Sequence, residues 1–159
     1  MQDIVGAVKA ELQGYADRGV FRNFSISEST TGKAVEFRFQ WLAESAFILK
    51  LNSEKPELQL RNVLPAVPFP SEMDTAFRNF LIQRCDESIP AHRRLDGGRF
   101  SFVCRNRQQM LSVVIGFAPE DAAAAANSSI KLLHEIFNNF LHEGPYQNYM
   151  VEVFHVSEE

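Results

Sequence analysis

The chain has 159 residues, and 45% of them are hydrophobic, which is enough for one domain with a buried core. Its formal net charge of -4 and pI near 5.6 exclude the excess of basic residues from which general affinity for DNA or RNA arises. Two cysteines are too few for a disulfide framework, and no apolar run approaches the length that crosses a bilayer. We therefore expect a cytoplasmic protein with neither a nucleic-acid nor a membrane partner.

The first half of the chain predicts one helix followed by a four-strand meander. Apolar residues recur at three- and four-residue spacing between positions 3 and 18, which is typical of an amphipathic helix. Val35, Phe37 and Phe39 then alternate with polar residues, as in a strand with one face in water. The expected strands cover residues 21–28, 33–42, 47–51 and 58–60.

The middle of the chain predicts an apolar linker and a second helix. Residues 63–70 contain three prolines, which prevent regular strand pairing. Ser71 follows and is expected to cap a helix that ends before Pro90. The apolar face of this helix, which includes Phe77 and Leu81, indicates that it packs on the sheet.

Residues 91–117 predict three more antiparallel strands joined by two polar turns. The Asp96-Gly97-Gly98 turn suits a tight hairpin, because glycine readily adopts the positive φ angles that such a turn requires. A second turn is expected at 106–109. Residues 110–117 are apolar on both faces and are predicted to lie in the middle of the sheet, with the basic residues 91–95 at its rim.

The last part of the chain predicts a long helix over residues 119–142 and a final strand over 149–156. The alanine run at 122–126 has two interpretations. Its high helix propensity is one, and a close helix-to-helix contact, across a dimer interface, is the other. The predicted fold is a single α+β domain over residues 1–156, with antiparallel meanders flanked by an N-terminal, a middle and a long C-terminal helix. Residues 157–159 are expected to be a frayed tail.

This order of elements resembles that of the small acidic dimeric chaperones and regulators of the type III secretion chaperone class, which also place helices around a twisted antiparallel sheet. The resemblance is one of arrangement, and the strands at 58–60 and 149–156 are additions to it. It implies a homodimer that binds a peptide or protein partner.

Candidates for catalysis and metal binding are few. His134 and His142 lie eight positions apart on the last helix, too far apart to share a metal ion, so we expect neither a metal nor a cofactor. His134 with Glu135 could act as an acid–base pair, but adjacent helix residues point about 100° apart, and we expect both on the solvated surface. Cys104 is predicted to act as a small apolar group, and Cys85 is the better candidate for a reactive thiol.

Arginines are concentrated in residues 84–107, where six arginines and three acidic residues give a net charge of +3. They have two interpretations: they protect an exposed strand edge, or they bind an anionic ligand or partner through guanidinium groups. The candidate anion- or partner-binding residues are Arg93, Arg94, Arg99, Arg105 and Arg107.

The chain also has 14 phenylalanines, and we expect some aromatic residues to line an apolar groove. The candidates are Phe21, Trp41, Phe47 and Phe69. The leading hypothesis is a non-catalytic protein-binding module, a chaperone-like adaptor or regulator that accepts a peptide at a sheet edge or apolar groove. One alternative is a sensory domain whose arginines hold an anionic small ligand, and another is an enzyme whose site joins distant residues such as His92, Asp96 and Glu152.

Overall fold

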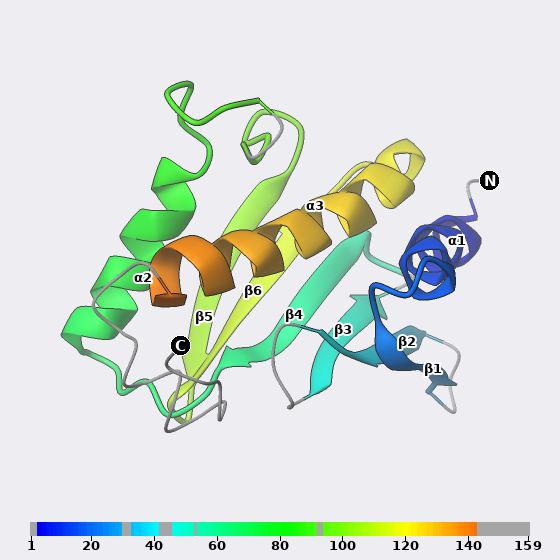
Figure 1. Ribbon diagram of the computed structural model, residues 1–159, viewed down its shortest axis with the longest axis horizontal. Helices are drawn as coiled ribbons and strands as arrows, with labels where there is room; N and C mark the ends of the chain where they lie inside the picture. The colour runs from blue at the N-terminus through cyan, green and yellow to red at the C-terminus, as the bar shows by residue number, and fades with distance from the viewer. Residues whose placement is uncertain (1–2, 30–32, 42–45, 53, 92–93, 143–159) are drawn as a thin grey trace.

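The computed structural model describes residues 3–29, 33–41, 46–52, 54–91 and 94–142. It confirms the predicted α+β class: within these residues, helices flank one antiparallel sheet of six strands in the order β1-β2-β3-β4-β6-β5 (Figure 1). The elements are α1 (Ile4–Asp17), β1 (Arg22–Glu28), β2 (Ala34–Gln40), β3 (Ala46–Asn52), β4 (Glu57–Leu64), α2 (Glu72–Gln83), β5 (Ser101–Arg107), β6 (Met110–Gly116) and α3 (Ala122–Glu135). A 3-10 turn precedes α3, and a π-helical segment, Ile136–His142, follows it.

The predicted four-strand meander is confirmed, and its inner face forms the core. Rows of apolar side chains cross the sheet, because alternate residues of neighbouring strands lie opposite one another. In one row Phe37 is opposite Leu49, Leu49 is opposite Leu60, and Leu60 is opposite Val113. All four side chains are buried. Helices α1 and α3 lie over this inner face (Figure 1).

The alanine run makes a helix-to-helix contact within one chain. Ala122, Ala125 and Ala126 are buried, and α3 packs against α1. Directly after the run, the side chain of Asn127 donates a 2.6 Å hydrogen bond to the hydroxyl of Tyr15 in α1. Small side chains allow this close approach, so the run does not need a second subunit to explain it.

The expected strand at residues 91–95 is wrong for the residues that can be checked, namely Ala91, Arg94 and Leu95. The amide of buried Leu95 donates to the carbonyl of Arg84 at the end of α2, at 2.9 Å, rather than to a strand. Gly97 and Gly98 do not adopt positive φ angles, because Asp96 closes the turn with its carboxylate. The predicted three-strand meander is therefore the hairpin β5–β6, preceded by a loop.

The turn expected at 106–109 is confirmed in a tighter form. Gln108 and Gln109 have φ angles of 52° and 65°, so they make a two-residue turn of the kind that matches strand twist, without glycine. Strand β6 lies between β4 and β5, as its apolar faces predicted. The strand expected at 149–156 lies outside the described residues.

Candidate functional site

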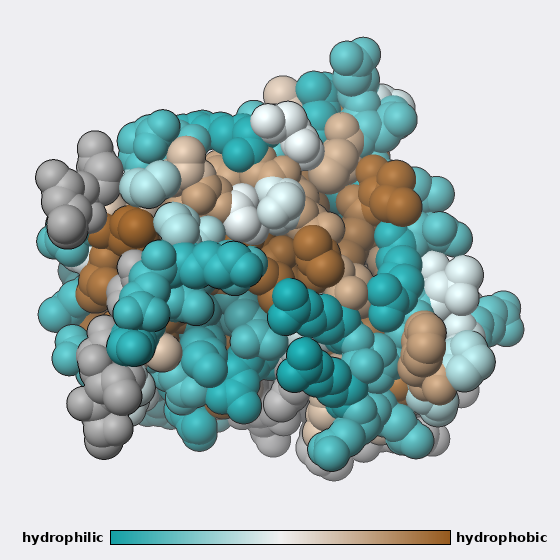
Figure 2. Space-filling model, turned by 180° about the vertical axis from the view of Figure 1, so that it is seen from behind, coloured by the Kyte–Doolittle hydropathy of each residue, from teal (hydrophilic) through white to brown (hydrophobic). Residues whose placement is uncertain are grey.

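A groove of about 500 Å³ lies between α2 and β5. Strand β5 is last in the sheet order. Within the described part of the chain, its edge away from β6 therefore lies beside α2 and not beside another strand. The groove is lined by Arg78, Leu81, Ile82 and Cys85 on one side and by Gly97 and residues 100–104 on the other. Figure 2 shows apolar surface at the end of the sheet where β5 lies beside α2.

Two large apolar side chains at this groove are exposed to solvent. Ile82, in the last turn of α2, is 72% exposed, and Val103, on the outer face of β5, is 47% exposed. Their neighbours Leu81 and Phe100 are buried, so the groove has an apolar floor as well as an apolar rim. Exposed apolar surface beside a hollow is typical of a binding site.

A polar network fixes α2 beside β5 and so sets the shape of the groove. The buried carboxylate of Asp74 accepts hydrogen bonds from Arg78 at 2.7 Å and from Asn106 at 2.8 Å. Arg78 also donates to the backbone carbonyl of Cys104 at 3.2 Å, and Asn106 donates to the carbonyl of Val67 at 2.9 Å. The network therefore joins α2 to β5 and to the loop between β4 and α2.

This network keeps Asp74 ionised. Burial raises the pKa of its carboxyl group, but the hydrogen bonds from Arg78 and Asn106 outweigh that effect and leave the pKa below its ordinary value. A carboxylate with a lowered pKa and two internal donors is a poor proton donor at neutral pH. Asp74 therefore holds the helix in place.

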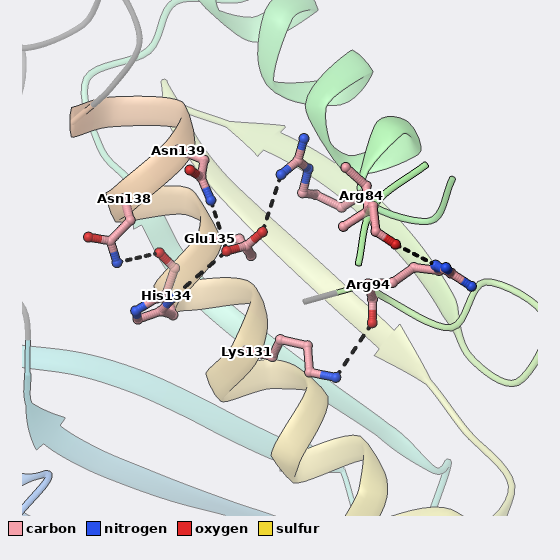
Figure 3. Close-up of polar contacts among 8 residues, drawn as sticks. Arg84, Arg94, Lys131, His134, Glu135, Asn138 and Asn139 are labelled. Atoms are coloured by element: carbon pink, nitrogen blue, oxygen red, sulfur yellow. Dashed lines mark hydrogen bonds and ion pairs between the residues drawn. The ribbon is translucent and has the colours of Figure 1, made fainter. Parts of the chain in front are cut away.

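A second buried pair joins the end of α2 to α3 (Figure 3). Glu135, 1% exposed, accepts a 3.2 Å hydrogen bond from Arg84 and a 2.8 Å hydrogen bond from Asn139. The expectation that Glu135 lies on the solvated surface is thus wrong, although its neighbour His134 is exposed as expected. The signal was available in the sequence, since Glu135 lies three residues after buried Leu132 and so falls on the apolar stripe.

Both cysteines line the groove, and neither is an activated nucleophile. Burial raises the pKa of Cys104 to about 11, as expected for a thiol among apolar side chains. Burial, followed by the negative charge of Asp96, also raises the pKa of Cys85. Both groups are protonated at neutral pH, so the geometry does not favour the reactive thiol that the sequence suggested for Cys85.

The structure does not gather the five predicted arginines into one site. Arg94 donates to the carbonyls of Ile89 and Glu87 and so holds its own loop, whereas Arg99 forms an ion pair with Asp121. Arg93 lies outside the described residues. The remaining two, Arg105 and Arg107, lie on the outer face of β5, where they share a second hollow with Lys50 and Arg61. Sequence reasoning missed the last two residues because they belong to the first half of the chain.

The four predicted aromatic groove residues are also separated. Phe21 and Phe47 are buried in the core, where Phe21 stacks on Phe39 with ring centres 4.0 Å apart. Trp41 is partly buried beside Phe21 and stacks with His134. Phe69 is 65% exposed, and the guanidinium of Arg78 lies 5.5 Å from its ring centre. Of the four, Phe69 alone lies near α2.

No family model, curated protein or solved structure matches the chain. Among the described side chains, no group of three histidine, cysteine or acidic residues could hold a metal ion. In the same part of the chain, every helix is too short or too polar to cross a membrane.

Proposed function

We propose that this protein is a non-catalytic protein-binding module, a chaperone-like adaptor or regulator that holds an extended apolar segment of a partner protein in the groove between α2 and β5. The observation that carries this proposal is the pair of exposed side chains, Ile82 and Val103, on the rim of an apolar hollow. Burying them removes apolar surface from water, which is the main favourable contribution in most protein association. An extended segment suits the groove because its alternate side chains point the same way.

The size of the exposed surface indicates weak, reversible binding. Covering the exposed parts of Ile82 and Val103 contributes on the order of 2 kcal/mol, and inserted side chains of the partner add a similar amount. A micromolar complex needs about 8 kcal/mol. The sum of about 4 kcal/mol corresponds to a dissociation constant of about 1 mM for a short peptide, and we expect tighter binding for a longer partner.

The polar groups around the groove support binding over catalysis. Asp74 and Arg78 hold α2 against β5, and the two thiols are protonated at neutral pH. These groups therefore support the walls of the groove instead of presenting a reactive atom to a bound molecule.

The homodimer and the cytoplasmic location predicted from the sequence belong to the same proposal. Sedimentation velocity at two protein concentrations about a hundredfold apart tests the dimer. If a second copy occupied the groove, the dimer would dissociate when an apolar peptide was added, and the groove would be a self-association site.

An NMR titration tests the groove directly. The probe is an eight-residue peptide of alternating valine and serine, blocked at both ends and added to about 1 mM, a concentration that detects complexes as weak as about 4 kcal/mol. We expect amide shifts around Ile82 and Val103, and their loss in Ile82→Glu. Met110→Glu is the matched control, because Met110 is an exposed apolar residue on the same sheet outside the groove. Equal loss in both variants, or no shifts in the native protein, would contradict the proposal.

A further inference from the structure

The outer face of the sheet, opposite α1 and α3, is the face seen in Figure 2. It has a hollow of about 290 Å³ that is separate from the groove. Its lining includes four basic side chains, an amide and a hydroxyl, and it shares no residue with the groove. These residues are Lys50, Gln59, Arg61, Arg105, Arg107 and Ser112.

Sheet register explains why these residues meet. Lys50 in β3 lies opposite Gln59 in β4, and Arg105 in β5 lies opposite Ser112 in β6. Strand β6 separates β4 from β5, so basic side chains on the outer face reach the hollow from both sides of β6. The β4–β6 pairing shifts register between Leu60 and Leu64, the stretch that contains Arg61. Such irregularities are common where a sheet re-aims a side chain.

The charges in this hollow are not fully balanced by acidic side chains in the described part of the chain. Arg61 donates to Glu36 at 2.7 Å, so one of the four positive charges has an acidic partner. Within the described residues, Lys50, Arg105 and Arg107 form no ion pair. Three unpaired like charges in one hollow repel one another, and a bound anion with more than one negative charge would relieve that repulsion.

We propose that the hollow binds the phosphoryl group of a small organic phosphate. A phosphoryl group carries close to two negative charges and three acceptor oxygens, which matches two guanidinium groups and one ammonium group. Gln59 adds a neutral donor at the same place. A carboxylate carries a single charge, which one arginine already satisfies, so the excess of positive charge selects the phosphate. This site goes beyond the proposed peptide groove and does not depend on it.

Calorimetry at constant ionic strength tests this site with two probes of matched shape, phenyl phosphate and benzoate. We expect phenyl phosphate to bind at least about tenfold more tightly than benzoate, and Arg105→Gln and Arg107→Gln each to weaken it about tenfold. Glu36→Gln should tighten binding severalfold, because it releases Arg61 from its ion pair. Arg22→Gln is the control, since Arg22 is an exposed arginine on β1, at the far edge of the sheet.

The inference is overturned if benzoate binds as tightly as phenyl phosphate, if Arg22→Gln weakens binding as much as Arg105→Gln, or if no binding is seen. It is also overturned if the protein binds an RNA oligonucleotide or anionic lipid vesicles but neither small probe. Arg105 and Arg107 are exposed, so thermal melts of their variants should match the native protein and show that lost binding is not lost folding. The peptide titration reports separately on the groove, so either proposal can fail alone.

Discussion

The β1–β4 meander and strand β5 belong to one sheet, but different interactions stabilise the meander and the corner where α2 meets β5. In the meander, rows such as Phe37 and Leu49 pack apolar side chains against α1 and α3. At the corner, the buried carboxylates of Asp74 and Glu135 fix α2 through arginine partners. Apolar packing fills the space between the sheet and helices α1 and α3, whereas α2 is held by hydrogen bonds and ion pairs at a few residues. The corner therefore has room for a groove between a helix and the sheet, whereas α1 and α3 pack directly on the inner face of the meander.

The largest effect is expected where packing is densest. Phe37→Ala removes a fully buried ring from the inner face of β2 and should lower the free energy of unfolding by about 4 kcal/mol, because it leaves a cavity. Urea unfolding followed by circular dichroism measures this. Val103→Ala, at a half-exposed position of β5, should change stability by less than about 1 kcal/mol. Similar losses for the two variants would remove the contrast between the regions.

The second prediction concerns the buried pair that joins α2 to α3. Glu135→Leu leaves the largely buried guanidinium of Arg84 without its acidic partner and should cost about 3 kcal/mol of unfolding free energy. Adding Arg84→Met should recover most of that loss, because it removes the unpaired charge. A double-mutant cycle from urea unfolding measures the coupling. If the double variant were less stable than Glu135→Leu, side-chain packing rather than charge would explain the cost.

The third prediction is a pH dependence at the corner. Asp74→Asn should lower the free energy of unfolding by about 2 kcal/mol at pH 7, since it weakens hydrogen bonds from Arg78 and Asn106. The pKa of Asp74 is lowered in the folded state, so its stabilisation is present above the ordinary value of about 3.8 and is lost as pH falls through the lower native pKa.

The gap between the native protein and Asp74→Asn should therefore narrow when unfolding is measured below pH 3.8. Exposed Glu72, in the same helical turn, supplies the control: Glu72→Gln should be nearly neutral at both pH values. A gap for Asp74→Asn that is constant with pH would mean that its carboxylate does not supply the stabilisation.

The smallest effect on stability is expected at the rim of the groove. Ile82→Ser removes a side chain that is 72% exposed and should change the free energy of unfolding by less than about 0.5 kcal/mol. The same substitution should still weaken peptide binding in the NMR titration. A large loss of stability would show that Ile82 supports the fold, and the groove would lose its clearest recognition residue.

Local patterns were sufficient for most of the fold. Alternation in β2, the apolar run in β6, the stripe on α1 and the Ser71 cap of α2 predicted their elements, since each depends on neighbours within a few residues. The prediction failed at Ala91, Arg94 and Leu95, the described residues of a short apolar and basic stretch that looks like an edge strand. There the amide of Leu95 finds its partner at the end of α2, and no local pattern specifies that contact.

The sequence by itself determined most of the described helices and strands, the α+β class and the apolar inner face of the sheet, because periodicity of 2 or 3.6 residues is a local property. Tertiary structure alone decided which polar residues meet. Lys50 and Arg61 reach Arg105 through strand order and a register shift, and Arg84 reaches Glu135 across 51 positions of chain. Such contacts depend on how distant elements pack, so spacing along the chain could neither assemble the basic hollow nor place the groove beside β5.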